Sequence, residues 1–289
     1  MLVMIADILL DTVLDGAKLL PFLFLTYLAL EYLEHKASEK TEELVRKSGR
    51  LGPVAGGVLG VLPQCGFATA ASNFYAGRVI TMGTLIAVYL STSDEMLPIM
   101  LTNLNSDRVT VGTILFLLLT KMTVGIIAGF AIDLMLPARK EEHVHIHEMC
   151  EHEHCHCEKG IVRSAFVHTM QIFVFILLVG ILLGLILQLI GEDSLSNLIL
   201  NRPVIGPILA GLVGLIPNCS ASVAITQLYI ENALSFGAML SGLLVNAGVG
   251  LVVLFKVNHH KLENLKILGL LYGIGVVVGI LFGFIEQFV

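Results

Sequence analysis

Charged residues are scarce in this sequence. Of its 289 residues only 14% are charged, whereas 56% are hydrophobic. The charges are confined to a few short intervals, and the apolar runs between them have roughly the length needed to cross a bilayer. Because backbone groups in lipid must be satisfied within the chain, we expect an all-α polytopic membrane protein.

A cleavable signal peptide is also missing from the first residues. They contain no basic n-region and no small-residue cleavage site, since the only early charges are Asp7, Asp11 and Asp15, before Lys18. We therefore expect the mature protein to start at the first residue. The three Asp share one helical face opposite Leu and Ile, which predicts an amphipathic surface segment over residues 1–16. A solvated acidic face is the preferred interpretation, and a cation-attracting mouth is the alternative.

Cysteine is rare, with five residues in the chain. Cys65 and Cys219 lie in two interrupted apolar stretches, and Cys150, Cys155 and Cys157 lie in one hydrophilic loop. The odd number and the clustering in a loop expected to face the cytosol argue against a disulfide framework. We therefore expect free thiols.

Two apolar stretches are interrupted by proline and polar residues: VLPQCGFATAASNFYAG, from Val61, and LIPNCSASVAITQLYIE, from Leu215. Such a sequence breaks a helix and frees backbone groups, so each interruption must be buried in protein or line a cavity. The two halves of the chain align without a gap at an offset of 154 residues. Pairs that carry the alignment include Gly52 and Gly206, Pro53 and Pro207, Pro63 and Pro217, Cys65 and Cys219, Tyr75 and Tyr229, Gly125 and Gly279, and Gly129 and Gly283. The chain is therefore predicted to be an internal duplication.

Basic residues predict the topology, because Lys and Arg accumulate in cytoplasmic loops. Loops 36–50, 137–163 and 256–266 are rich in them and are expected inside, whereas loops 103–110 and 191–203 hold one Arg each and are expected outside. Equivalent loops then face opposite sides, so the two repeats are predicted to be inverted, which is a transporter signature. Both termini are predicted to lie on the outer side of the cell membrane, and loop 137–163 on the cytosolic side.

The two predicted transmembrane repeats, 17–136 and 164–289, contain five segments each and are joined by loop 137–163. The interrupted segments, 52–80 and 206–234, have arms of about 13 to 16 residues, or roughly 20 to 24 Å, which is short of the ~30 Å apolar core. Re-entrant hairpins are therefore favoured, although two tilted crossings would fit the charges equally well. Hairpins that enter from opposite faces would bring their tips together near the midplane.

The two tips supply Gln64, Cys65, Asn218 and Cys219. Soft sulfur combined with amide oxygen suits a thiophilic or borderline ion. The alternative is that small residues and Cys merely permit close helix packing. We assign the four residues, with Asn73, to a predicted substrate-binding set.

An acidic pair lies in the stretch LSTSDEMLP, residues 90–98. Asp94 and Glu95 are about 12 residues from the inner end of a helix expected to begin near Thr81, and a charge at that depth costs at least ~2.5 kcal/mol unless it is paired or hydrated. The pair is therefore predicted to bind a divalent cation such as Mn²⁺ or to relay protons. The alternative is a water-exposed helix end or a bond to Lys121.

Polar neighbours complete this second part of the predicted site. Ser91 and Thr92 add hydroxyl oxygens, and Asn246 is the polar residue kept at the equivalent place in the second half. Lys121 lies in the middle of a predicted helix. We expect it to neutralise Asp94 or Glu95 when no cation is bound, so the three charged residues form the predicted coupling set.

The loop EEHVHIHEMCEHEHCHCEKG is dense in metal ligands. They are His143, His145, His147, Cys150, His152, His154, Cys155, His156 and Cys157. The alternation of ligand and spacer suits a flexible chelating tract better than a fixed zinc finger. Capture, buffering or sensing of metal on the cytosolic face is predicted, and a cytosolic collector indicates export. An inert linker is the alternative.

These motifs together resemble a known family. The runs LPQCGFATAASNFYAGRVITMGTLIAVYLSTSDEMLPIM and LIPNCSASVAITQLYIENALSFGAMLSGLLVNAGVG, with the loop ending CHCEKGI, are similar to the bacterial and archaeal ten-helix heavy-metal exporters, also described as manganese transporters or arsenic efflux proteins. The resemblance covers essentially the whole chain. It implies an exporter whose motif positions here are Gln64, Cys65, Ser91, Thr92, Asp94, Glu95 and Cys219.

The functional prediction is a secondary active exporter of a divalent metal ion, Mn²⁺ first, that works by alternating access around a midplane site. The sequence contains no GxxxxGK[ST] motif, so an ion gradient is the expected drive. The pattern HExxH occurs only within the irregular His- and Cys-rich loop, at residues 152–156, and no enzyme is expected. Efflux of arsenite or an organoarsenical through the paired Cys is the alternative within transport, and a metal sensor or a lipid carrier is the alternative outside it. The expected partners are the metal ion and the lipid bilayer, with no resident cofactor and no nucleic acid, and a homo-oligomer stays open.

Overall fold

The computed structural model describes residues 51–62, 65–93, 96–104, 108–136, 203–217 and 219–288, together with isolated helical positions within 20–28 and 162–178. Helices are the only regular structure in these ranges, which confirms the predicted all-α class. The predicted N-terminal segment and the loop 137–163 lie outside the described residues. So do most of the two helices expected to open the repeats, at about 17 to 35 and 165 to 190.

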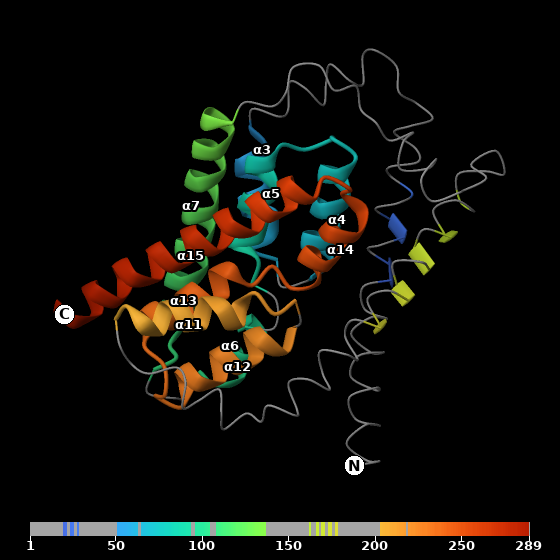
Figure 1. Ribbon diagram of the computed structural model, residues 1–289. Helices are drawn as coiled ribbons and strands as arrows, with labels where there is room; N and C mark the ends of the chain where they lie inside the picture. Colours follow the sequence, from blue (N-terminus) through green and yellow to red (C-terminus); the bar gives the residue numbers. More distant parts are fainter. Residues whose placement is uncertain are drawn as a thin grey trace.

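The helices whose bounds lie in the described ranges form two series of five (Figure 1). The first series is α3 (Gly52–Gly60), α4 (Cys65–Ala76), α5 (Met82–Ser91), α6 (Met96–Thr102) and α7 (Val111–Met135). The second is α11 (Ile205–Gly214), α12 (Cys219–Ile230), α13 (Phe236–Val245), α14 (Val249–Val257) and α15 (Lys261–Phe288). Both bounds of α12 follow those of α4 by 154 residues, as those of α13 follow those of α5. The duplication found in the sequence therefore extends to the helix boundaries.

Local details repeat at the same offset. Thr81 accepts a hydrogen bond from the backbone N–H of Thr84 at 3.1 Å and caps α5, and Ser235 accepts one from Ala238 at 3.3 Å and caps α13. The turns before these caps contain the non-glycine residues with positive φ, Arg78 at 58° and Asn232 at 63°. Each interrupted segment thus returns to its next helix through the same turn.

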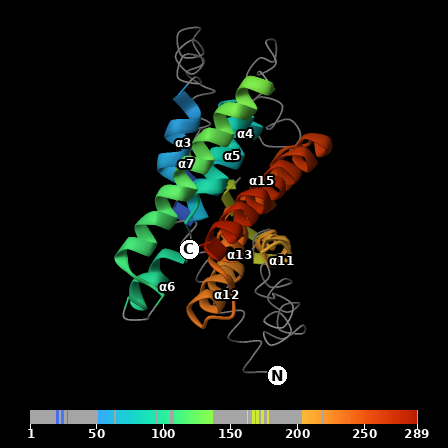
Figure 2. The ribbon, with the colours of Figure 1, turned by 90° about the vertical axis from the view of Figure 1, so that its left-hand side faces the viewer.

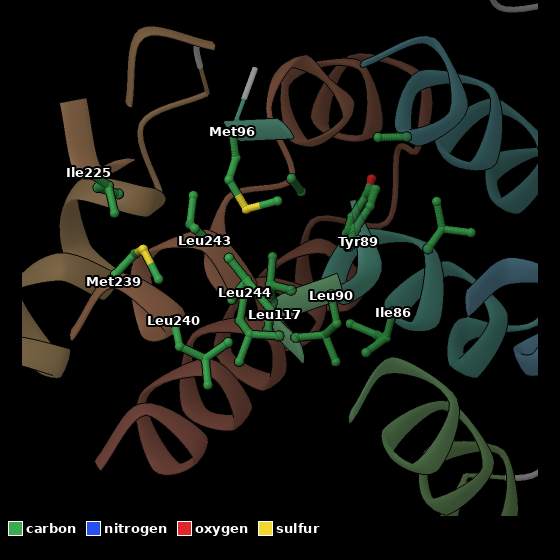
Figure 3. Packing of buried hydrophobic residues seen from close by; sticks show 14 of the residues in the cluster. Ile86, Tyr89, Leu90, Met96, Leu117, Ile225, Met239, Leu240, Leu243 and Leu244 are labelled. Carbon is green, nitrogen blue, oxygen red and sulfur yellow. The ribbon is translucent and has the colours of Figure 1, made fainter. Parts of the chain in front are cut away.

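Helices α5 and α13 form the centre of the molecule. Every residue from Gly83 to Ser91 and from Gly237 to Val245 is buried. Helix α5 packs against α3 and α7, and α13 packs against α11 and α15. Figure 3 shows where the two central helices approach each other, with Leu90 of α5, Leu117 of α7 and Leu244 of α13 in one apolar cluster.

The long helices α7 and α15 present large apolar side chains outward. Leu134 of α7 is 85% exposed and Leu262 of α15 is 77% exposed. Within the described residues three helical stretches are long and apolar enough to cross a membrane, namely Val111–Met135, Phe236–Val257 and Lys261–Glu286. Apolar surface on this scale is suited to contact with lipid. The protein is accordingly a multi-pass membrane protein.

Glycines allow the central and outer helices to come into close contact. A Cβ atom added to Gly237 would lie 2.5 Å from the carbonyl oxygen of Gly279, and one added to Gly125 would lie 2.8 Å from that of Ala87. The first contact joins α13 to α15 and the second joins α7 to α5. Small residues at such crossings are a standard packing device of membrane helices.

The second arm of each interrupted segment packs against a helix of the other series. Helix α4 lies along α14, and α12 lies along α6. The first pairing is close, because a Cβ atom on Gly250 would lie 2.8 Å from that of Ala68. The halves therefore interlock rather than lie side by side as separate domains.

Two sequence expectations need correction. The arms of the interrupted segments have 9 and 12 residues in the first half and 10 and 12 in the second, fewer than expected. The helix expected to carry the STSDE motif is not continuous, since α5 ends at Ser91 and α6 begins at Met96. The second half is interrupted likewise between α13 and α14, after Val245. Each half thus contains two helix interruptions.

Candidate functional site

The two interruptions of the first half lie next to each other. The Ser93 hydroxyl, in the second interruption, donates a hydrogen bond of 2.5 Å to the carbonyl of Val61, in the first. A Cβ atom on Gly60 would lie 2.7 Å from the carbonyl oxygen of Val88 and closer still to the Ser91 hydroxyl. The end of α3 therefore packs directly on the end of α5, so the described residues next to the two interruptions are in contact.

Hydroxyl groups close the last turn of α5. The Ser91 hydroxyl donates to the carbonyl of Ala87 at 2.8 Å, and that of Thr92 donates to Val88 at 2.7 Å. Ser91, Thr92 and Ser93 are all at most 2% exposed. Such bonds to the preceding turn are compatible with a helix, and α5 ends at this point. Their oxygen lone pairs remain available as acceptors.

Lys121 joins the helix ends of both halves. It lies in the middle of α7 and is 1% exposed. Its Nζ atom donates a very short hydrogen bond to the carbonyl of Thr92, the residue after α5, and one of 2.6 Å to the carbonyl of Leu243, in the last turn of α13. Carbonyls at helix C-termini lack helical partners and carry partial negative charge. One buried ammonium thus contacts the negative ends of two helices.

Asn246 marks the corresponding interruption in the second half. Its side-chain oxygen accepts a hydrogen bond of 3.0 Å from the backbone N–H of Gly248, a residue with a φ of 52°. Asn246 is 2% exposed, and its amide nitrogen has no hydrogen-bond partner in the part of the chain that the structure describes. A buried donor of this kind calls for a solvent or solute oxygen.

The structure places the remaining predicted residues less completely. Asn73 is buried in α4, about 12 Å along the helix axis from Cys65 at 1.5 Å per residue. Cys65 and Cys219 are the first residues of α4 and α12, but their side chains lie outside the described set. The predicted residues outside it altogether are Gln64, Asp94, Glu95, Asn218 and the nine His and Cys of loop 137–163. Among the described residues no group of three His, Cys, Asp or Glu could hold a metal ion.

A polar cluster that the sequence did not reveal connects α4, α5 and α14. Ser72 Oγ and Tyr89 Oη lie 2.7 Å apart, and both donate to the carbonyl of Gly250, at 2.8 and 3.2 Å. Ser72 Oγ also contacts the carbonyl of Ala68 at 2.8 Å. The cluster holds α4 and α5 of the first half against α14 of the second half. Ser72 corresponds to Thr226 at the 154-residue offset, and this match of two hydroxyl residues is the sequence signal for the cluster.

A second set of residues, the Tyr75 cluster, joins the end of α4 to the start of α15. Arg78 forms a 3.1 Å ion pair with Glu263, and its guanidinium lies 5.6 Å from the centre of the Tyr75 ring. Tyr75 donates a long hydrogen bond, 3.4 Å, to the same carboxylate. Glu263 belongs to the second half, so the cluster holds the second arm of the first interrupted segment against it.

The equivalent tyrosine forms the Tyr229 cluster. The Arg108 guanidinium lies 5.3 Å from the centre of the Tyr229 ring and donates a hydrogen bond of 3.1 Å to the carbonyl of Leu234. Arg108 precedes α7, whereas the other two residues belong to the second half. The two clusters are therefore counterparts built around tyrosines 154 residues apart. The repeat alignment flagged both tyrosines without indicating their partners.

Asp133, near the end of α7, caps a neighbouring helix. Its carboxylate accepts hydrogen bonds from the Thr81 hydroxyl at 2.7 Å and from the Gly83 backbone N–H at 2.9 Å. In the second half Glu286 accepts one of 3.0 Å from the N–H of Phe236. Carboxylates from α7 and α15 thus cap the N-termini of α5 and α13, where the helix dipole favours negative charge.

The fold and the site define a class of protein: a multi-pass helical membrane protein in which helices of both halves end inside the molecule around polar groups. A comparison with protein families is in agreement. The family described as "Putative, 10TM heavy-metal exporter" matches residues 4–193, which is more than half of the chain, and the protein belongs to this family. Comparisons with curated proteins and with solved structures gave no match.

Proposed function

We propose that the protein is a secondary active exporter of a divalent transition-metal ion, with Mn²⁺ as the first candidate, and that it works by alternating access. Membership of the heavy-metal exporter family supports the substrate class and the direction. The observation that carries the mechanism is the contact of Lys121 Nζ with carbonyls at helix ends from both halves. In transporters built from repeats, the ion site lies at the repeat interface and uses such interrupted helices.

The direction of the helices supports an inverted relation between the halves. In Figure 2, α7 rises from the lower left, whereas α15 starts at the upper right and descends toward the C-terminus. The Tyr75 cluster lies at the start of α15 and the Tyr229 cluster just before the start of α7, so they lie toward opposite ends of the molecule. We propose that they are the contacts that open alternately on the two sides of the membrane.

The residues in named roles are those of the two motifs. Asp94 and Glu95 would bind the cation and exchange a proton for it, with Ser91, Thr92 and Asn246 as oxygen donors. Gln64, Cys65, Asn218 and Cys219 would complete the shell from the hairpin tips. The His and Cys of loop 137–163 would collect metal on the cytosolic side. Asn73 would line the path along α4.

Transport assays in proteoliposomes test this proposal. Uptake of Mn²⁺, Zn²⁺, Co²⁺ and arsenite would be measured under an imposed pH gradient for the wild type, for Asp94→Asn and for Cys65→Ser with Cys219→Ser. Glu231→Gln is the matched control, because it removes a carboxylate at an exposed position after α12. We expect Mn²⁺ flux in the wild type and the control, and its loss in Asp94→Asn.

Two outcomes would contradict the proposal. Arsenite flux that depends only on the two cysteines, with no flux of any divalent metal, would replace the carboxylate site by a thiol site. Divalent metal flux that is unchanged in Asp94→Asn would leave the substrate class intact and remove the acidic pair from its role.

A further inference from the structure

The surroundings of Lys121 have the character of a cation-binding position. Two carbonyl oxygens from different halves of the chain contact one point, and that point is occupied by the Nζ atom of a side chain that is 1% exposed. Thr92 ends α5 and Leu243 lies in the last turn of α13, so both oxygens belong to helix C-termini. Unwound carbonyls and half-helix C-termini are the groups that coordinate cations in transporters with interrupted helices.

The side chain that fills this position is an unusual choice for a merely structural bond. A buried ammonium is costly in an apolar region, whereas neutral hydroxyl or amide donors could close the same carbonyls. Indeed, Ser91, Thr92 and Ser93 close neighbouring carbonyls in this way. A positive charge is attracted to the partial negative charge at two helix C-termini, whereas a neutral donor is attracted only weakly. The position therefore selects for charge.

We propose that the Lys121 ammonium is a tethered cation that occupies part of the transport site, so that it and the transported cation compete for the carbonyl oxygens of Thr92 and Leu243. This inference rests on the proposed function and deepens it. Binding of the metal ion displaces Nζ from the two oxygens. Nζ connects the C-terminal ends of α5 and α13 through these two carbonyls. When the ion displaces Nζ, the ion itself connects the two helix ends.

Competition of this kind lowers the apparent affinity for the cation. If Nζ holds the oxygens for more than nine tenths of the time, its removal lowers the apparent dissociation constant at least about tenfold. A positive charge of different shape at the same place should preserve the competition. The predicted pattern thus depends on charge at residue 121, beyond the mere presence of a hydrogen-bond donor.

Cation-dependent thermal stabilisation of the purified full-length protein tests this pattern without requiring transport. Four forms would be compared: the wild type, Lys121→Arg, which keeps the charge, Lys121→Gln, which keeps a donor without charge, and Lys121→Met, which keeps neither. Lys266→Met removes the same charge at an exposed position of α15 and is the control. The melting temperature would be followed against MnCl₂, NaCl and KCl, with choline chloride to hold the ionic strength constant.

We expect the Gln and Met variants to reach half-maximal stabilisation at a cation concentration at least about tenfold lower than the wild type, with Arg and Lys266→Met like the wild type. All forms share the His- and Cys-rich loop, so metal binding there cancels in the comparison. Equal half-maximal concentrations in all forms, or loss of cation stabilisation in the Gln variant, would overturn the inference. The Gln variant retains donors for both carbonyls, so it decides the question even where the Met variant does not fold.

The outcome is separable from that of the proposed function. If the wild type exports metal and the Gln variant gains no affinity for the cation, the exporter function is supported and the role of Lys121 in the cation site is contradicted. A Gln variant that gains affinity for Na⁺ or Mn²⁺, while the wild type exports no metal, establishes the cation position and contradicts the exporter.

Discussion

The crossing of α5 and α7 at Gly83 yields a stability prediction that does not depend on the transported substrate. A Cβ atom on Gly83 would lie 2.5 Å from the carboxyl group of Asp133 and closer still to the carbonyl oxygen of Gly129. Ordinary contact begins near 3.4 Å, so the helices would have to separate by about 1 Å. We therefore expect Gly83→Ala to destabilise the protein.

The magnitude follows from three contributions. Overpacking a close contact costs about 1–3 kcal/mol. Displacement of Asp133 weakens its hydrogen bonds to Thr81 and to the N–H of Gly83, which contributes about 1 kcal/mol more. Replacement of a helical Gly by Ala returns up to about 1 kcal/mol through helix propensity. The net expectation is a loss of about 2 kcal/mol in the free energy of unfolding.

A matched control exists on α15. A Cβ atom on Gly273 would meet nothing within 4 Å, so Gly273→Ala keeps the propensity gain without the clash and should stabilise by about 0.5–1 kcal/mol. Unfolding by SDS titration in mixed micelles would measure both variants. A Gly83→Ala protein as stable as the wild type, or a Gly273→Ala protein destabilised to the same degree, would refute the packing argument.

Two further predictions concern polar contacts between the halves. Glu263→Gln removes the ion pair between Glu263 and Arg78, whose side chains are 26% and 19% exposed, respectively, and should lower the free energy of unfolding by less than about 1 kcal/mol. The difference in stability between the wild type and the variant should shrink as the NaCl concentration is raised, because salt screens the ion pair. A difference that does not depend on salt would count against an ionic contact. Tyr89→Phe removes the hydroxyl beside Ser72 and Gly250 and should cost about 1 kcal/mol, because Ser72 still donates to the same carbonyl. Melting temperatures of the variants measure this effect, and a change no greater than the experimental error would show that the cluster is dispensable.

The helix interruptions show how far the sequence predicts the site. The break after α3 was predictable, because Pro63 cannot continue a helix and its neighbours are polar. The break after Ser91 carries no proline or glycine, and we expected the helix to continue through Asp94. At this end three consecutive hydroxyl side chains bond to backbone carbonyls, which local periodicity does not reveal. Pro98 lies in the first turn of α6 and has no N–H with which to continue a helix from α5. The cost of a charge at that depth is compatible with a break as well as with a ligand, and the ligand role of Asp94 and Glu95 stays a prediction.

The partners of Lys121 were beyond sequence reasoning for a different reason. Its depth in α7 was predictable, and so was a need for compensation. We assigned that compensation to Asp94 or Glu95, which lie outside the described residues, and this assignment stays a prediction. The structure brings the ends of α5 and α13 to Nζ, and backbone carbonyls have no sequence signature. The same holds for Arg108, whose partners Tyr229 and Leu234 follow it by more than a hundred residues.

The arrangement of contacts indicates which parts would move if the halves rock against each other as proposed. Helices α5 and α13 are buried throughout and are held to α7 and α15 by glycine contacts at backbone distance, so each of these pairs should move as one body. The Arg78–Glu263 ion pair of the Tyr75 cluster is partly exposed, and a contact of this kind separates at lower cost than packed helices. Lys121 bridges the two bodies near the helix interruptions. A change of cation at that bridge therefore acts directly on a contact between the two bodies.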